Sequence, residues 1–177
     1  HGYEATSLAD LVEATGAKAP TLYAEFVNKE GLFRAVLDRY ISRFAAKHEA
    51  LLFDDQKTVD QALRDYFTAV ATCFTSKDTP AGCFMINTSA ALAASSTDIA
   101  NTIKSRHAVQ EQTLTQFLQQ RQQRGELPAQ GNVLQLAQFL NCVLQGMSIS
   151  AREGADFATL KQISDTTLRL WPQILQP

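Results

Sequence analysis

The sequence of 177 residues has few cysteines and no long apolar run. Its three cysteines, Cys73, Cys83 and Cys142, are widely spaced, which is typical of free thiols in a reducing compartment rather than of a disulfide framework. No apolar run approaches the roughly 18 residues that a membrane span needs, and the sequence contains no secretory signal. We therefore expect a cytoplasmic protein that has no membrane partner.

Positive charge is not in excess either, because 16 Lys and Arg stand against 18 Asp and Glu. This balance excludes a polybasic protein whose whole surface holds nucleic acid, although it allows a local basic patch. Motifs of catalysis are also missing: there is no His-Glu-x-x-His, no Cys-x-x-Cys and no phosphate-binding glycine loop, and the three histidines lie far apart. We expect no enzyme, no cofactor and no metal site.

Apolar residues recur at three- and four-residue steps along most of the chain, whereas the alternation typical of strands is absent. Clusters of Gly, Pro, Asn and Asp separate these periodic stretches. The pattern predicts an all-α fold, and 45% hydrophobic residues suffice for a core. The predicted helices cover about 7–15, 19–26, 29–50, 58–76, 84–94, 97–124, 132–153 and 156–174.

The first two predicted helices form a short pair with a tight turn. Thr6 or Ser7 can cap the first helix, with Asp10 as the acidic partner of a capping box. Gly16 allows a left-handed turn residue, and Pro20 suits the first turn of the second helix. Such a pair is either a helix-turn-helix, whose second helix enters the DNA major groove, or an ordinary helical hairpin.

The residues of this pair resemble a known DNA-binding region. The chain contains the strings Gly2-Tyr3-x-x-Thr6-Ser7, Gly16, Pro20-Thr21-Leu22-Tyr23-Ala24-Glu25-Phe26 and Lys29-Glu30-x-Leu32-Phe33. These strings resemble the TetR/AcrR (tetracycline-repressor-like) family of bacterial transcriptional regulators. The resemblance implies a helix-turn-helix domain over 1–48, which begins with a further helix before Gly2, and a helical effector-binding and dimerisation domain over 49–177.

The resemblance also implies which residues lie near DNA. Leu22 and Phe26 would be buried packing residues, whereas Lys29, at a helix start, is well placed for a phosphate. In an arbitrary helical protein such lysines are simply solvated, but residues 16–47 carry six Lys and Arg against three acids, which favours DNA. The predicted DNA-binding residues are Thr6, Ser7, Lys18, Ala19, Pro20, Thr21, Tyr23 and Lys29.

An effector pocket is the second site that the resemblance implies. Aromatic, thiol and amide side chains of the larger domain would line it, although such residues at helical spacing are usually core. Cys83 falls at a predicted helix N-terminus, where a lowered thiol pKa would favour oxidation or electrophile capture. The residues considered for the pocket are Phe67, Phe74, Cys83, Phe84, Met85, Asn87, His107, Phe117, Phe139 and Cys142.

The last two predicted helices carry broad apolar faces, which the resemblance assigns to a four-helix homodimer interface. The alternative is an interior helix in a monomer. The predicted function is a repressor of a palindromic operator that a small effector releases; the alternative is a helical ligand-binding or protein-interaction module without specific DNA binding. The residues considered for the interface are Leu136, Leu140, Val143, Leu144, Met147, Leu160, Ile163, Thr167, Leu170 and Trp171.

Overall fold

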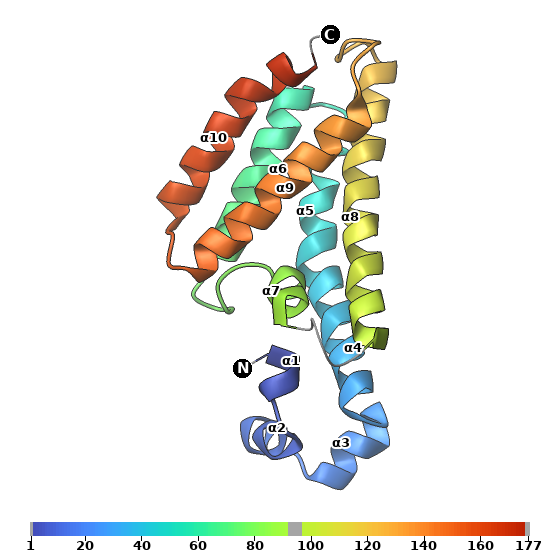
Figure 1. Ribbon diagram of the computed structural model, residues 1–177, viewed down its shortest axis with the longest axis vertical. Coiled ribbons are helices and arrows are strands. Elements are labelled where there is room, and N and C mark those ends of the chain that lie inside the picture. Colours follow the sequence, from blue (N-terminus) through green and yellow to red (C-terminus); the bar gives the residue numbers. More distant parts are fainter. Residues whose placement is uncertain (1, 92–96, 176–177) are drawn as a thin grey trace.

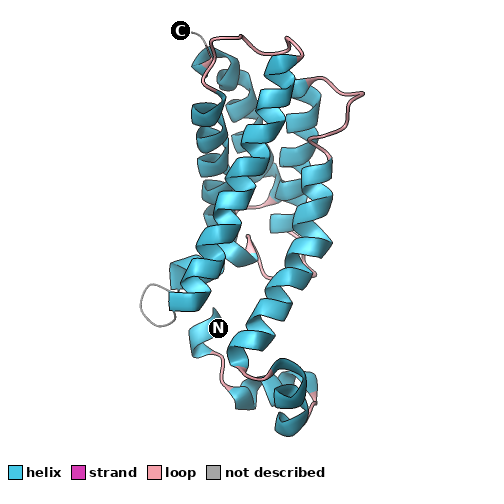
Figure 2. Cartoon of the chain, turned by 90° about the vertical axis from the view of Figure 1, so that its right-hand side faces the viewer, coloured by secondary structure: helices cyan, strands magenta, loops and turns pink. Residues whose placement is uncertain are grey.

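The structure is a computed structural model that describes residues 2–91 and 97–175. Every regular element in these ranges is a helix, which confirms the predicted all-α fold (Figures 1 and 2). Short N-terminal helices form one end of an elongated molecule, and a bundle of longer helices forms the other (Figure 1). Within the described ranges, no helix combines the length and the apolar character that crossing a bilayer requires.

The N-terminal end consists of α1 (Gly2–Ala5), α2 (Leu8–Thr15) and α3 (Ala19–Phe26). The capping box that begins α2 is present: Asp10 N–H donates to Ser7 Oγ at 3.1 Å, and Ser7 N–H donates to the Asp10 carboxylate at 2.7 Å. Gly16 ends α2 with a φ of 67°. The caps and the tight turn were therefore predicted correctly from the sequence.

A long helical connection joins this end to the bundle (Figure 1). It consists of α4 (Lys29–Tyr40), η1 (Ile41–Ala45) and α5 (Ala46–Ala50), and η1 is a π-helix. Ala46 N–H donates to Ile41 C=O, five residues back, so this turn holds one residue more than an α-helical turn. The predicted uninterrupted helix over 29–50 therefore contains a wide turn that the sequence did not indicate.

The bundle consists of α6 (Val59–Phe74), α7 (Phe84–Ala91), α8 (Thr97–Gln123), α9 (Val133–Arg152) and α10 (Phe157–Ile174). Its helix α10 packs against α6 and α9, and α8 packs against α9. All of these bounds lie within a few residues of the predicted ones, except that the predicted end of the 84–94 helix falls outside the described residues.

The bundle core is mostly apolar, and the one charged side chain among its buried described residues, Arg121, has several partners. Phe67 and Phe117 are among its largest fully buried side chains. Arg121 is only 3% exposed, and its guanidinium donates to the carbonyls of Lys57 at 2.7 Å and Asp54 at 2.9 Å. It also pairs with Glu126 at 2.9 Å. Arg121 therefore fastens the loop between α5 and α6 to the end of α8.

Candidate nucleic-acid interface and central cavity

One face of α3 is open to solvent at the far end of the molecule (Figure 1). Lys18, Pro20, Thr21 and Tyr23 are all exposed, and Tyr23 reaches 47%. Ala19 is half-buried. The hydroxyls of Thr21 and Tyr23 and the ammonium of Lys18 are donors of the kind that contact base edges and phosphates. The structure thus presents most predicted readers on one accessible helix.

The flanking predicted residues are more constrained. Lys29 begins α4 and is half-buried, with its ammonium 4.5 Å from the ring centroid of Tyr3. Thr6 is also half-buried, and with Tyr3 and Lys29 it lines a groove of about 220 Å³. Ser7 is exposed, but its hydroxyl accepts the capping bond of α2. Lys29 therefore reaches the surface over an aromatic ring, a contact that the sequence did not predict.

The end of α3 departs from the expected packing. Leu22 and Phe26 were expected to be buried, but both are half-buried. None of the residues of α2 and α3, which the structure describes in full, is buried. Val27 follows with a φ of 66° and a ψ of −49°, and Asn28 N–H donates to Phe26 C=O at 2.7 Å. This is a γ-turn with positive φ, which is strained for a β-branched residue.

A continuous series of aromatic rings connects α1 and α4 to the bundle helix α7. The ring centroids of Tyr3 and Phe33 lie 5.2 Å apart, those of Phe33 and Phe84 5.6 Å, and those of Phe84 and Tyr40 5.6 Å. Phe84, which was considered for the effector pocket, therefore lies at the junction between α4 and α7. A rotation of α4 cannot leave α7 and α1 undisturbed, because tightly packed rings transmit displacement.

Polar contacts also tie α4 to α8. Arg106 pairs with Asp38 at 2.7 Å, and Arg34 donates to Thr102 Oγ1 at 2.9 Å. Both pairs are partly exposed, so each contributes little to stability. Their main effect is to hold α4 in place against the first half of α8.

A partly open cavity of about 40 Å³ lies beside η1 in the bundle. Phe74, Cys83 and Met85 line it, as considered from the sequence. Sequence reasoning missed most of the other lining residues, although the spacing of Tyr40, Phe44 and His48 at four-residue steps places those three on one helix face. The missed residues are Tyr40, Phe44, Ala45, His48, Glu49, Tyr66, Val70 and Gln110.

The environment of this cavity favours neutral groups. Burial raises the pKa of the Tyr40 and Tyr66 phenols, of the Cys73 thiol and of the Glu49 carboxyl, and it lowers the pKa of His48. Each shift moves its group toward the uncharged form.

Cys83 is buried at this cavity. The Tyr40 hydroxyl donates to Cys83 Sγ at 3.7 Å, and Cys83 N–H donates to Ser148 Oγ at 2.7 Å. Oxidation or electrophile capture by Cys83 remains a prediction.

The structure separates the other residues considered for the pocket. Phe67 and Phe117 are fully buried in the core, where they fill space between helices. Phe139 is half-buried at the edge of the core, and Cys142 is exposed.

The two polar residues considered for the pocket lie elsewhere. Asn87 donates from its side chain to Ala81 C=O at 2.9 Å. His107 lines a different cleft, between α8 and α9. The residues considered for one pocket therefore do not all line the same cavity, because helical periodicity does not specify which faces meet.

The residues considered for the dimer interface also divide. Val143 and Ile163 are half-buried, and Leu170 is 47% exposed. The rest are buried inside this one chain, because α9 and α10 pack against each other and against α6. They contribute to the core of the single chain rather than to an open surface: Leu136, Leu140, Leu144, Met147, Leu160, Thr167 and Trp171.

Among residues 2–91 and 97–175, no three His, Cys, Asp or Glu side chains are placed to hold a metal ion together.

Comparison with known proteins places the whole chain. Residues 1–36 match the bacterial regulatory proteins of the tetR family, and residues 59–165 match the tetracyclin repressor-like C-terminal domain. The chain is 73% identical over 176 residues to the HTH-type transcriptional repressor ComR of Escherichia coli (strain K12). This match covers 99% of this chain and 84% of ComR. It is 29% identical over 154 residues to the repressor BdcR of the same strain, covering 86% of this chain and 72% of that protein.

The fold has solved counterparts as well. The TetR family transcriptional regulator CifR, in a cysteine mutant complexed with a 26bp double-strand operator DNA, superimposes with a TM-score of 0.89 at 26% identity. The match covers 97% of this chain and 89% of that chain. Sequence motifs, helix arrangement and relatives agree: the chain belongs to the tetR family of bacterial regulatory proteins and is a DNA-binding transcriptional regulator.

Proposed function

We propose that the protein is a homodimeric repressor that acts in the bacterial cytoplasm, holds a palindromic operator and is released by a small effector. Residues 1–48 would bind DNA, and residues 49–177 would bind the effector and the second subunit. ComR and BdcR are named as repressors, and CifR was solved on operator DNA, which supports this role. A regulatory rather than catalytic role also agrees with those relatives.

The observation that carries the proposal is the aromatic series from Tyr3 through Phe33 and Phe84 to Tyr40. Tyr3 lies in α1, directly before the helix-turn-helix in the sequence, and Tyr40 lines the central cavity. An effector that displaces Tyr40 therefore displaces the ring on which the DNA-binding end rests. Effector and DNA would then favour different conformations, and the difference in affinity sets the extent of release.

The cavity is small, so an effector that binds there must displace the side chains that line it. A volume of about 40 Å³ holds a few waters at most, whereas sites for small organic ligands measure hundreds of cubic ångströms. An effector can enter only if the lining side chains on η1 and α6 move apart. Because the lining groups are shifted toward their neutral forms, we expect an uncharged effector.

The wide turn η1 is where such a movement would be absorbed. It lies between the DNA-binding end and α5, and Phe44 and Ala45 from this turn line the cavity. Single π-turns inside helices are frequent at functional sites, because the extra residue loosens the hydrogen-bond ladder. We assign η1 the role of the hinge between effector and DNA.

The dimer would use side chains that the single chain leaves open. Ile149 on α9 and Phe157, Leu170 and Ile174 on α10 are each between 37% and 47% exposed. Two copies of this surface, related by a two-fold axis, would place two α3 helices on half-sites about one DNA turn apart. We expect Leu170→Glu to weaken the dimer in sedimentation experiments, while Leu136→Glu unfolds the chain.

Operator binding by the full-length protein tests the proposal. After selection of an operator from random double-stranded DNA, Lys29→Ala should weaken binding to all sequences and reduce the salt slope by about one. Lys47→Ala, which removes an exposed lysine from α5, is the matched control and should leave the slope unchanged. Absence of any sequence-selective binding would overturn the proposal, and an unchanged slope for Lys29→Ala would remove that phosphate contact.

A further inference from the structure

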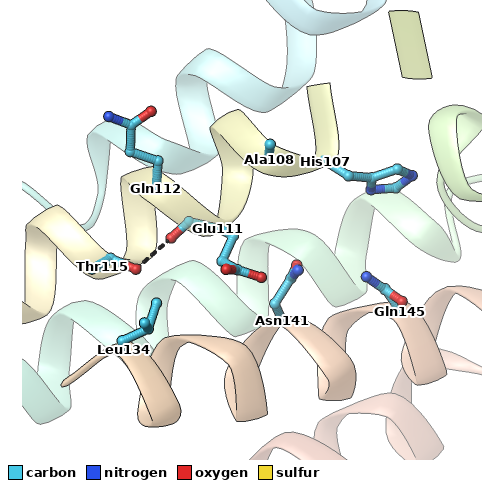
Figure 3. A pocket seen from close by; sticks show the side chains of 8 residues that line it. All are labelled: His107, Ala108, Glu111, Gln112, Thr115, Leu134, Asn141 and Gln145. Atoms are coloured by element: carbon cyan, nitrogen blue, oxygen red, sulfur yellow. Dashed lines mark hydrogen bonds between the residues drawn. The ribbon is translucent and has the colours of Figure 1, made fainter. Parts of the chain in front are cut away.

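A second cleft, of about 430 Å³, opens between α8 and α9 (Figure 3). His107 and Glu111 line it from α8, and Asn141 and Gln145 line it from α9. It shares no lining residue with the central cavity, so it is a separate site. Its volume lies within the range of pockets that hold small organic ligands.

The cleft contains a buried acceptor that lacks a partner. Asn141 is only 6% exposed, and its Oδ1 has no hydrogen-bond partner in the described part of the chain. Nδ1 of His107 is also buried and has no hydrogen-bond partner among the described residues. Leaving a buried amide oxygen unbonded costs free energy, so native proteins rarely retain one without a purpose. Because Asn141 lines the cleft, a donor placed there would satisfy it.

The charge of the cleft selects the kind of donor. Glu111 is the one acidic side chain that lines it, and no Lys or Arg does. Figure 3 shows the Glu111 carboxylate directed toward α9, beside the Asn141 amide. One protein contact to this carboxylate is long, from Gln138 Nε2 at 3.4 Å. Burial lowers the pKa of His107, which favours its neutral imidazole beside Glu111.

The remaining walls suit an organic body. Leu134 and Ala108 contribute apolar surface beside the polar groups. A ligand that combines a cationic N–H group with a small apolar part would therefore complement both features.

We propose that the cleft between α8 and α9 binds a small organic cation with N–H donors, an ammonium or amidinium, which pairs with Glu111 and donates to Asn141 Oδ1. The site is positioned to act on DNA binding through α8. Arg106, one residue before His107, pairs with Asp38 on α4 at 2.7 Å. A ligand that draws α8 toward α9 would pull on this pair, which makes the cleft a regulatory input separate from the central cavity.

Titration with matched probes tests the proposal. Benzamidine and benzylamine are compared with benzyl alcohol, their neutral analogue, by calorimetry on the full-length protein without DNA. Because no operator is present, the outcome is independent of the proposed repressor function. We expect saturable binding of both cations, and binding of benzyl alcohol at least about tenfold weaker, since a charge-assisted hydrogen bond is lost.

Variants locate the binding. Glu111→Gln keeps the shape of the side chain and removes its charge, and it should weaken cation binding about tenfold or more. Asn141→Leu should weaken it as well, with circular dichroism to confirm folding. Glu49→Gln in the central cavity and Glu153→Gln on the surface are the controls and should bind normally.

Three outcomes would overturn the proposal: no saturable binding of either cation to the wild type, equal affinity for benzyl alcohol, or unchanged affinity in Glu111→Gln. A change in dimerisation for Glu111→Gln without cation binding would instead show that a second copy of the chain covers the cleft.

Discussion

The helix-turn-helix and the bundle differ in how they are held together. Neither α2 nor α3 contains a buried residue, whereas half of the 16 residues of α6 are buried. The bundle has a core of its own, and the DNA-binding end rests on α4 and α7 through Tyr3, Phe33 and Phe84.

This difference indicates where movement is easy. Elements with few buried apolar contacts open or shift at low free energy, whereas a packed core moves only as a unit. The protein therefore combines a rigid bundle with a helix-turn-helix whose orientation depends on a few aromatic contacts. Substitutions in the bundle should therefore change the global free energy of unfolding. Substitutions at the junction should change local opening of the helix-turn-helix, measured by amide exchange.

The largest expected effect comes from the buried guanidinium in the bundle. Arg121→Met leaves Glu126 Oε1 and the three loop carbonyls of Leu52, Asp54 and Lys57 without their guanidinium donor, so we expect the free energy of unfolding to fall by about 3 kcal/mol. Arg124→Met is the matched control, because it breaks an exposed pair with Asp55 and should cost less than about 1 kcal/mol. Urea denaturation measures both, and equal losses would contradict a special role for Arg121.

A smaller effect should appear at the junction. Phe84→Ala removes the ring between Phe33 and Tyr40 and should cost about 2 kcal/mol, less than for a fully buried Phe. Its distinctive result is faster amide exchange in α2 and α3, with unchanged exchange in α6. Phe53→Ala removes another partly exposed ring, far from the junction, and should leave exchange in α3 unaltered. Uniform acceleration in every helix would refute a selective role for Phe84.

Local sequence signals predicted most of the fold. Ser7, Asp10, Gly16 and Pro20 act within one or two turns, so their roles follow from the local sequence, and the structure confirms them. The wide turn η1 gave no signal, because no Pro or Gly marks residues 41–45. A π-turn there depends on packing against the bundle, which the local sequence does not encode.

The sites were predicted less completely, for a physical reason. Thr21 and Tyr23, which we expect to contact DNA, belong to one short helix, so the motif alone places them together. A cavity needs faces from several helices, and periodicity does not say which faces meet. His107 and Phe67 share helical spacing with true cavity residues, yet they lie in a separate cleft and in the core.

A strained residue lies at the DNA-binding end, directly after α3. Val27 has a φ of 66°, which glycine adopts without steric cost, so Val27→Gly should raise stability by about 1 kcal/mol. Val36→Gly is the control, because it places glycine at an exposed site inside α4 and should lower stability by about 1 kcal/mol. Opposite signs in denaturation experiments would confirm the strain, and two losses would contradict it.

The smallest expected effect distinguishes the two regions by their response to pH. Burial lowers the pKa of His48 and His107 in the bundle, so the unfolded chain binds protons that the folded chain resists. The stability that this contributes is full above the ordinary histidine pKa of about 6.5 and is lost as the pH falls below it.

Glu49 acts in the opposite direction, because burial raises its pKa and the folded chain takes up its proton first. Combined replacement of His48 and His107 by Gln should therefore flatten the fall in stability between about pH 7 and pH 5.5. Residues 2–28 contain no histidine, so amide exchange in α2 and α3, corrected for its intrinsic pH dependence, should report the same local opening at both pH values. The double variant and the wild type could instead lose stability equally steeply as the pH falls. In that case the two histidines would not cause the loss, and it would have to come from carboxyl groups, which both regions contain.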